Sequence, residues 1–304
     1  MGKGIPKMVR GRAARLVTVM AVVWSGGVGV PSAQAADAVL VAAGDIADCK
    51  ATGDSATAAL VRRTGGTVAA LGDLAYRDGT AQQFKACYGL TWGRFKSRTR
   101  PAVGNHEYQS KGANPYWDYF GNAAGPRGKG WYSYNAGSWH VIVLNGNCRA
   151  YVNCSKGSEQ ERWLRADLAA HDNKCTLAYW HTSRFASDSD YGGYKEVGPF
   201  WEALYEHGAD VVLGAHSHVY ERFAPQTPWG KADPEHGIRQ FVVGTGGKDL
   251  DRFRSARPNS QVRNANTFGV LKLTLKSGSY DWDFIPQKGK SFRDSGSGSC
   301  HGRP

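Results

Sequence analysis

The sequence predicts an α/β fold built from mixed sheets with flanking helices. Short apolar runs rich in Val, Leu and Ala recur along the chain, and each ends at a glycine or a polar cluster. Segments with a helical pattern separate several of these runs, whereas the last runs follow one another in pairs. Alternation of strands and helices favours parallel strands covered by helices, and consecutive strands favour antiparallel pairs.

Each apolar run is read as a strand because it is short and shows little alternation of apolar and polar residues. Such runs are typical of strands that are buried on both faces. In chain order they are Ala38–Ala43, Thr67–Leu71, Pro101–Val103, His140–Leu144, Thr176–Trp180, Asp210–Leu213, Gln240–Val243, Val270–Leu275 and Tyr280–Phe284.

Three segments between the strands have the spacing of helices: Ser55–Arg63, Ser158–His171 and Lys195–His207. The second has the clearest start, because Ser158 and Glu161 have the spacing of a capping box. Trp163, Leu164 and Leu168 then line one face of this helix, as expected for a helix that packs on a sheet.

Two further segments are expected to lack regular structure. Residues 108–135 are rich in glycine and aromatic residues, and a loop of that length is usually functional or disordered. We expect it to be exposed. Residues 287–304 are basic and rich in glycine and serine, which predicts a loose tail. No internal repeat or interdomain linker is found, so one domain is expected.

The N-terminus has the layout of a secretory signal peptide. Five basic residues and no acidic residue lie within positions 3–15, the apolar run Leu16–Val30 follows, and Ala33-Gln34-Ala35 forms a small-residue cleavage site. A membrane anchor is disfavoured because the run is short and contains three glycines. We therefore expect residues 1–35 to be removed, and residues 36–304 to form one domain exported to the periplasm or the medium.

Composition and charge narrow the class of protein. Apolar residues make up 41% of the chain and charged residues 21%, which excludes a disordered, collagen-like or coiled-coil chain. The net charge of +12 falls to +7 once the basic residues of the signal peptide are left out. The remaining basic residues are scattered, without a basic–aromatic module, so no stable nucleic-acid complex is expected.

The six cysteines all follow the signal peptide, and their even number predicts three disulfides in an oxidising compartment. Fifteen pairings are possible. Cys148 and Cys154 are close enough in sequence to close a short loop, and a bond from Cys300 would fasten the tail.

The chemistry of the chain is concentrated at the ends of five predicted strands. Each of these strands is followed by a carboxylate, amide or imidazole side chain, and these groups bind Zn, Mn or Fe. The carboxyl edge of the strands is where ligand sites form in α/β folds. In chain order these residues are Asp45, Asp73, Asn105 with His106, His181, and His216 with His218.

These motifs resemble those of the calcineurin-like metallophosphoesterases, and in particular the short secreted bacterial members of the purple acid phosphatase branch. The resemblance runs from Asp45 to Gly244-Thr245-Gly246-Gly247. It implies a four-layer α-β-β-α sandwich of two mixed sheets flanked by helices, with a site for two metal ions. The motifs that carry it are Gly44-Asp45, Gly72-Asp73-Leu74-Ala75-Tyr76, Gly104-Asn105-His106-Glu107, Trp180-His181 and Ala215-His216-Ser217-His218-Val219-Tyr220-Glu221-Arg222.

The resemblance also implies which residue holds which metal. Asp45, Asp73, Tyr76 and His218 would bind the first ion, with Asp73 bridging to the second ion held by Asn105, His181 and His216. Two carboxylates and a phenolate suit Fe(III), whereas the neutral donors suit a divalent ion such as Zn, Fe or Mn. Other calcineurin-like enzymes have a histidine two residues after the first aspartate. Here Ala47 stands there, which favours Tyr76 as the ligand.

The implied reaction is hydrolysis of a phosphate ester by in-line attack of a metal-bound hydroxide. His106 would donate a proton to the leaving group, or alternatively only orient the ligands. The loop from His181 to Arg184 lacks the second histidine that purple acid phosphatases use to touch phosphate. Arg184 would replace it as a phosphate clamp, or alternatively is a surface residue.

The sequence therefore predicts a secreted phosphatase that acts on small phosphate monoesters with Fe(III) and a divalent ion, without a membrane anchor. A phosphodiesterase acting on nucleotides, nucleic acids or phospholipid headgroups would use the same site. A secreted binding module that uses metals only for stability is the alternative from another class. The oligomeric state is left open.

Overall fold

The computed structural model describes residues 1–8, 11, 36–190 and 192–302. The chain divides into two units, Met1–Gln34 and Ala35–Pro304. In the first unit, residues 1–8 are exposed and form neither helix nor strand. Most of the predicted signal peptide lies outside the described residues. None of the helices in the described ranges is both long enough and apolar enough to span a membrane.

The second unit contains a six-stranded mixed sheet. Its parallel strands are β1 (Ala38–Ala43), β3 (Thr67–Leu71) and β5 (Thr99–Ala102), and its antiparallel strands are β13 (Gly269–Lys276), β14 (Ser279–Pro286) and β15 (Ser295–Ser299). The strand order is β15-β14-β13-β1-β3-β5. The three parallel strands therefore end at the same edge.

A second sheet has seven strands in the order β12-β10-β11-β9-β8-β7-β6. Four neighbouring strands are parallel, namely β7 (Trp139–Val143), β8 (Cys175–Thr182), β9 (Val211–Ala215) and β11 (Arg239–Val243). Antiparallel strands complete both sides: β6 (Tyr132–Ala136), β10 (Tyr220–Phe223) and β12 (Ser260–Asn264). Two short strands, β2 (Ala47–Asp48) and β4 (Ala75–Tyr76), pair separately.

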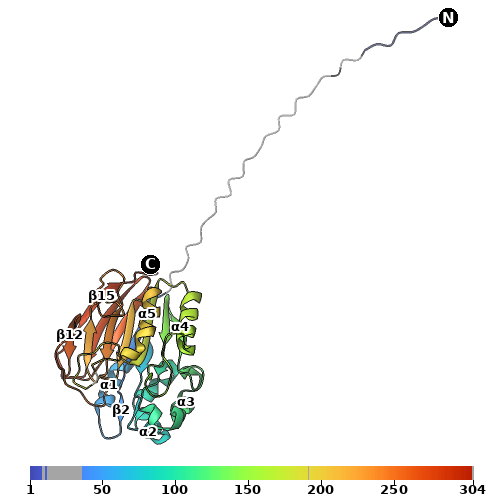
Figure 1. Cartoon of the computed structure of the whole chain (residues 1–304). Helices are drawn as coiled ribbons and strands as arrows, with labels where there is room; N and C mark the ends of the chain where they lie inside the picture. The colour runs from blue at the N-terminus through green and yellow to red at the C-terminus, as the bar shows by residue number, and fades with distance from the viewer. Residues whose placement is uncertain (9–10, 12–35, 191, 303–304) are drawn as a thin grey trace. The chain divides into compact units, whose positions relative to one another are not determined.

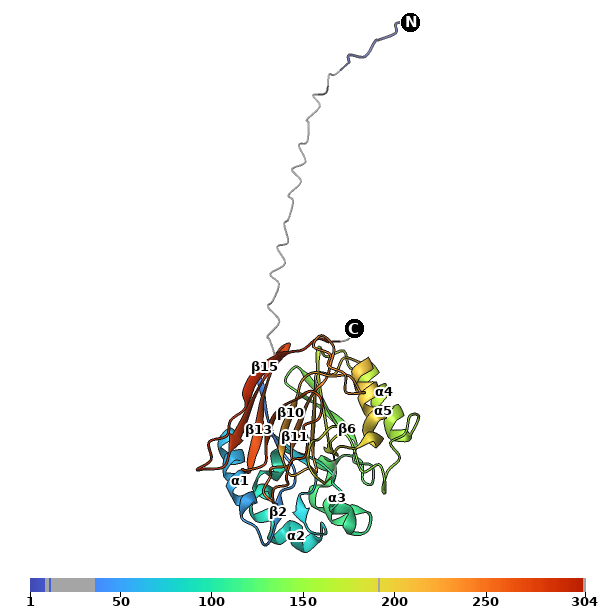
Figure 2. The same cartoon turned by 60° about the vertical axis from the view of Figure 1, so that its left-hand side comes forward.

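The four parallel strands of the seven-stranded sheet are buried on both faces, as the continuous apolar runs predicted. Along β8, Leu177 and Tyr179 belong to the core shared with the other sheet, whereas Ala178 and Trp180 belong to the core under the helices. Those helices are α4 (Glu159–Ala170) and α5 (Gly198–Glu206), which lie side by side in both views (Figure 1, Figure 2). Helix α1 (Gly53–Thr64) packs against β13 of the six-stranded sheet. The predicted four-layer architecture is confirmed.

The nine predicted strands all form, with ends shifted by no more than two residues. The helix predicted from Ser158 is α4, and the Ser158 hydroxyl accepts the Glu161 N–H. The capping box is incomplete, however, because the Glu161 carboxylate accepts the Gly157 N–H and pairs with Arg165. The segment predicted over 195–207 divides into a 3-10 turn (Lys195–Val197) and α5.

The expectation of a long exposed loop over residues 108–135 is wrong. This segment contains α3 (Asn114–Phe120), and Tyr116, Trp117 and Phe120 are at most 4% exposed. They pack with Phe84 of α2 (Ala81–Ala86), because aromatic rings that contact one another bury a large apolar area. The segment also contains the 3-10 turns Lys111–Ala113 and Gly121–Ala124 and the start of β6, and the 3-10 turns Tyr88–Leu90, Trp92–Arg98 and Glu107–Gln109 lie before it or at its beginning.

The expectation of a loose C-terminal tail is also wrong for the described residues. Ser295–Ser299 forms β15, which pairs with β14. Its glycines lie under aromatic rings: a Cβ on Gly296 would be 2.4 Å from the Trp282 ring, and one on Gly298 would be 2.5 Å from the Tyr280 ring. Glycine is therefore required by close approach and does not indicate a mobile chain.

The structure contains three disulfides, as the even cysteine count predicted. Cys148 pairs with Cys154 and closes the short loop, and Cys175 pairs with Cys300, which fastens the end of the chain beside β8. The third joins Cys49 to Cys87.

Candidate metal centre

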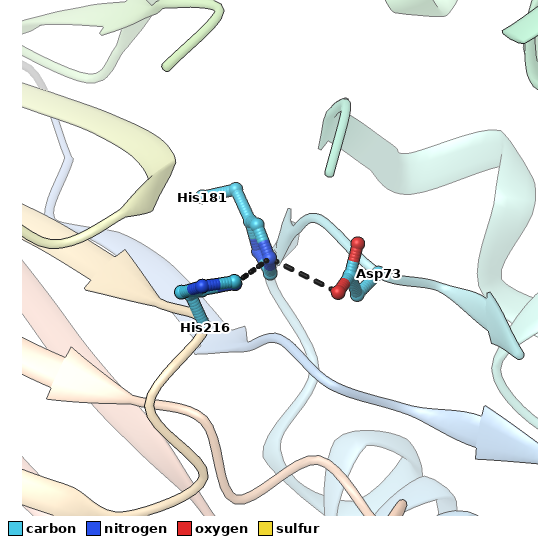
Figure 3. A group of neighbouring side chains, drawn as sticks. All are labelled: Asp73, His181 and His216. Carbon is cyan, nitrogen blue, oxygen red and sulfur yellow. Dashed lines mark hydrogen bonds and ion pairs between the residues drawn. The ribbon is translucent and has the colours of Figure 1, made fainter. Parts of the chain in front are cut away.

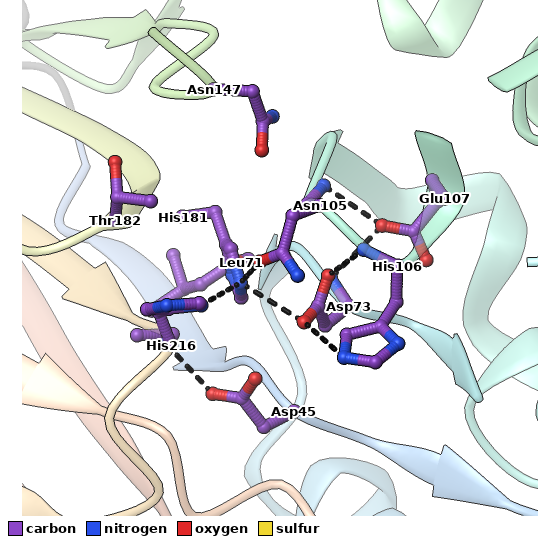
Figure 4. A network of polar contacts seen from close by, with 12 residues as sticks. Asp45, Leu71, Asp73, Asn105, His106, Glu107, Asn147, His181, Thr182 and His216 are labelled. Atoms are coloured by element: carbon purple, nitrogen blue, oxygen red, sulfur yellow. Dashed lines mark hydrogen bonds and ion pairs between the residues drawn. The ribbon is translucent and has the colours of Figure 1, made fainter. Parts of the chain in front are cut away.

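The seven residues predicted as metal ligands lie together at the edge where parallel strands of both sheets end. Asp45 and Asp73 follow β1 and β3, and Asn105 follows β5 (Figure 4). The other sheet contributes His181 from β8, together with His216 and His218, which follow β9. Tyr76 reaches the same place from the short strand β4.

One group of donors surrounds the ring of His181. Its Nε2 atom lies 3.1 Å from Asp73 Oδ2, 3.1 Å from Asn105 Oδ1 and 3.1 Å from His216 Nδ1 (Figure 3, Figure 4). One ligand atom from each of Asp73, His181 and His216 can be chosen so that all lie within 4.8 Å of one another. This is the separation expected of donors that share one ion.

A second group of donors surrounds the Tyr76 hydroxyl. Its oxygen lies 2.8 Å from Asp45 Oδ1, 3.2 Å from Asp73 Oδ2 and 3.2 Å from His218 Nε2. His218 Nε2 is also 3.3 Å from Asp45 Oδ1. Asp73 Oδ2 thus contacts both groups, so the carboxylate predicted to bridge occupies the position between them.

Two of the histidines, His181 and His218, can direct an Nε2 lone pair toward the other donors when their rings are neutral. His181 Nδ1 lies 2.9 Å from the Leu71 carbonyl oxygen, and His218 Nδ1 contacts the Asp249 carboxylate. Carbonyl and carboxylate oxygens only accept hydrogen bonds, so both Nδ1 atoms carry hydrogen and both Nε2 atoms are available as ligands. The outer contacts therefore select the tautomers that a metal requires.

Burial and charge also fit a cation at this place. Asp73 is 1% exposed; burial is the largest single effect and opposes its ionisation, but the charge and hydrogen bond of His181, together with the His106 and His216 charges, outweigh it and lower the pKa of Asp73. In return, although burial lowers it, the Asp73 charge raises the pKa of His181 to about 9. His218 beside Asp45 has its pKa raised to about 11 against the same effect of burial. The buried carboxylates thus favour positive charge at the positions of these two rings, and a cation bound to the neutral rings would supply that charge.

The pKa values of two other donors, His216 and Tyr76, are shifted so that their uncharged forms are favoured. Burial and then the His181 charge lower the pKa of His216 to about 3, so its ring is neutral and suited to bind a metal. Burial, followed by the Asp45 and Asp73 charges, raises the pKa of the Tyr76 phenol. Deprotonation of Tyr76 therefore requires a strongly acidic cation such as Fe(III), and the donor set fits that group.

The backbone is strained where it presents the ligands. Asp45, Asp73 and His216 have φ values of 58°, 52° and 72°, in the left-handed region that non-glycine residues rarely occupy. Directly after β5, a Cβ on Gly104 would lie 2.1 Å from Asp73 Oδ1, so only glycine allows this carboxylate to reach the centre. These features are common at functional sites, where the surrounding structure holds the strained residues in place.

Glu107 contributes a contact to which sequence reasoning assigned no role, although it lies in the same motif as Asn105. Its buried carboxylate accepts the N–H groups of Asp73, Leu74 and Gly104 at 3.0, 2.8 and 2.8 Å. It thereby ties the turn after β3 to the turn after β5. The signal available in the sequence was its position directly after the predicted ligand Asn105 and the predicted proton donor His106.

Tyr194 is a second residue that sequence reasoning missed. Its hydroxyl lies 2.8 Å from His216 Nε2, on the side of that ring that faces away from His181. Nothing in the local sequence distinguishes Tyr194 from the other tyrosines, because the contact depends on the distant Ser183, whose carbonyl accepts the Tyr194 N–H at 2.8 Å.

His106 lies at the rim of the centre. Its Nδ1 contacts the Arg77 carbonyl oxygen at 2.5 Å, and its Nε2 is 3.8 Å from Asp73 Oδ2. The side chain is 29% exposed, so solvent or a substrate can reach the ring. This position is compatible with both roles predicted for His106, proton donation to the leaving group and orientation of the ligands.

Arg184 is not brought to the centre by any of its described contacts. Its Nη2 donates to the Pro228 carbonyl at 3.2 Å, and its guanidinium lies 5.1 Å from the Phe185 ring centroid. Neither contact joins Arg184 to a predicted ligand, and the two roles predicted for it, phosphate clamp and surface residue, stay predictions.

A cavity of about 310 Å³ adjoins Asn105 and His216. One wall is formed by residues 147–151, in the loop closed by the Cys148–Cys154 disulfide, and another by Tyr194. The donors therefore lie next to a space large enough for a small organic group.

Comparison with known proteins agrees with this arrangement. The sequence profile described as "Calcineurin-like phosphoesterase" matches residues 10–220. The chain belongs to the calcineurin-like phosphoesterase family. The predicted family is confirmed, and the two sheets with terminal donors are the expected scaffold.

Purple acid phosphatases are among the relatives. Purple acid phosphatase 15 of Arabidopsis thaliana is 32% identical over 43% of this chain and 27% of its own length. Purple acid phosphatase 21 of the same plant is 32% identical over 67% of this chain and 49% of its own length. The chain thus spans about half or less of these relatives.

A solved purple acid phosphatase shares the fold. The structure of PPD1 from yellow lupin (Lupinus luteus) seeds superposes with a TM-score of 0.69 at 18% identity, covering 88% of this chain and 54% of that one. At this identity the likeness concerns the fold alone.

Proposed function

We propose that this protein is a secreted two-metal phosphatase that hydrolyses phosphate monoesters. The observation that carries the proposal is the position of Asp73, whose Oδ2 atom contacts both groups of donors. A carboxylate shared between two ligand sets is the arrangement expected of a two-metal centre that acts on phosphate. Membership of the phosphoesterase family and the purple acid phosphatase relatives support the same activity.

The seven donors would hold the ions in two sets that share Asp73. Asp45, Asp73, Tyr76 and His218 supply the anionic oxygens that favour Fe(III), and Asn105, His181 and His216 with Asp73 suit Zn, Fe or Mn in the divalent state. When bound, the two metals supply Lewis acidity toward the phosphate and a nucleophilic water.

The protein itself contributes a proton donor and an oriented site. We assign the proton transfer to Nε2 of His106, because Nδ1 is engaged by the Arg77 carbonyl and Nε2 faces the centre. Glu107 keeps the turns that bear Asp73 and Asn105 in register. The cavity beside Asn105 and His216 would receive the organic part of the substrate.

Metal content and substrate class test this assignment together. The purified protein should contain two metal ions and hydrolyse nitrophenyl phosphate faster than bis-nitrophenyl phosphate. Faster hydrolysis of the diester would replace the monoesterase with the diesterase alternative, which uses the same donors. A protein that binds metals and hydrolyses neither compound would be a metal-stabilised binding module.

Export is proposed on the sequence of residues 1–35 and is compatible with the three disulfides. Sequencing the N-terminus of protein recovered from outside the cytoplasm should give Ala36 as the first residue. A mature chain that begins at Met1 would contradict the proposed signal peptide and the domain boundary at residue 36.

A further inference from the structure

Residues 248–251, in the loop after β11, contact both the ring and the backbone of His218. The Asp249 carboxylate contacts His218 Nδ1, and Asp251 Oδ2 accepts the His218 N–H at 2.7 Å. The Asp251 N–H in turn donates to the His218 carbonyl at 3.1 Å. His218 is thus held at its ring and at both polar atoms of its backbone.

Lys248 fastens the same loop to the other residues of the first donor group. Its N–H donates to the Asp45 carbonyl at 3.0 Å, and its Nζ lies 3.1 Å from Asp249 Oδ2 and 3.2 Å from Asp48 Oδ2. The same ammonium is 5.4 Å from the centroid of the Tyr76 ring. The carboxylate behind His218 is therefore fixed in position by a charged partner that is only 14% exposed.

The three histidines of the centre differ in the partner behind them. His181 Nδ1 meets a neutral carbonyl of Leu71, and His216 Nε2 meets the Tyr194 hydroxyl. Within the part of the chain that the structure describes, His218 is the one of the three whose outer nitrogen contacts a carboxylate. A carboxylate partner pulls the imidazole hydrogen toward itself and makes the ligating nitrogen more basic.

We propose that Asp249, held by Lys248, is a positioning residue that makes His218 the strongest imidazole donor and directs the more highly charged ion to the Asp45–Tyr76–His218 side. The proposal rests on the ligand assignment made under Proposed function. It adds that the two metal positions are distinguished from outside the ligand set, by one carboxylate on a surface loop. Asp249 is 57% exposed, so it can be changed without disturbing the core.

Asp249→Asn tests the proposal, because asparagine keeps the shape and loses the charge. Zn²⁺ is titrated into metal-free full-length protein against a competing chelator, so that the two binding steps are resolved. We expect one step to weaken by roughly 10–100-fold and the other to stay unchanged. In protein loaded with Fe(III), the tyrosinate absorption should shift to longer wavelength, which identifies the weakened site as the one that contains Tyr76.

Two further variants make the result decisive. Asp118→Asn removes the same charge from an exposed residue of α3 that forms an ion pair with Arg127. This control should bind both metal ions as the wild type does. Asp249→Glu restores the carboxylate and should recover most of the lost affinity. Unchanged binding by Asp249→Asn, or equal weakening of both steps, would overturn the proposal. Failure of the wild type to hydrolyse any phosphate ester would refute the function and leave the binding asymmetry intact.

Discussion

Replacing His106 by glutamine separates a proton donor from a residue that only orients ligands. The Nδ1 of His106 is engaged by the Arg77 carbonyl, so Nε2 is the atom available for transfer. Its Nε2 is 3.8 Å from Asp73 Oδ2, which is too long for a hydrogen bond, so in the doubly protonated ring the Nε2 proton is left to reach a leaving group. Loss of a positioned general acid costs roughly 10²–10⁴-fold in turnover.

The cost to folding should be small. The variant loses one hydrogen bond to a carbonyl, of about 1 kcal/mol, and a ring contact with Tyr76 at 4.5 Å, of roughly 0.5–1.5 kcal/mol. The expected destabilisation is therefore about 1.5–2.5 kcal/mol, with both metals retained.

The assay compares two leaving groups. An alkyl phosphate needs a proton on its departing oxygen, so its kcat should fall by the full factor in the His106→Gln variant. Nitrophenolate leaves without a proton, and its kcat should fall less than about tenfold. His207→Gln is the control, because His207 also bonds a carbonyl, that of Ala203, away from the centre. An equal loss on both substrates, or loss of a metal, would refute the proton-donor role.

Three other outcomes follow from the structure. In iron-loaded protein, Tyr76→Phe should abolish the visible band and weaken one metal site, and a colourless wild type would remove Fe(III) from the assignment. Burial raises the pKa of Asp210 from 3.8 to about 6, so the free energy of unfolding of the wild type should fall by up to about 3 kcal/mol as pH rises from 4 to 6. Denaturation curves of Asp210→Asn should lack this fall, and a variant with the pH slope of the wild type would contradict the prediction. Joint replacement of Cys175 and Cys300 by alanine removes a disulfide between residues 125 positions apart and should lower the free energy of unfolding by roughly 2–5 kcal/mol. An unchanged midpoint of thermal unfolding would show that β15 holds the chain end without the disulfide.

The strands were predictable from sequence because a strand buried on both faces needs an unbroken apolar run. The residues after those runs were equally readable, since a carboxylate or imidazole directly after a buried strand is placed by the strand itself. Prediction failed where a local pattern has two physical meanings. The aromatic residues around Tyr116 suggested an exposed loop, yet they bury one another. The Ser-Gly alternation of β15 suggested mobility, yet its glycines make room for Trp282 and Tyr280.

What the sequence determined by itself is the set of donors and the strand edge from which each one projects. It could not determine that the edges of two different sheets meet, because Asp73 and His181 are brought together by sheet packing and not by any local spacing. The contacts around the donors likewise exist only in three dimensions. Arg184 donates to the carbonyl of Pro228, which lies 44 residues away in sequence, and Asp249 reaches His218 across 31 residues of sequence. Short-range patterns fix the type and direction of a side chain, whereas its partners are fixed by the packing of distant segments.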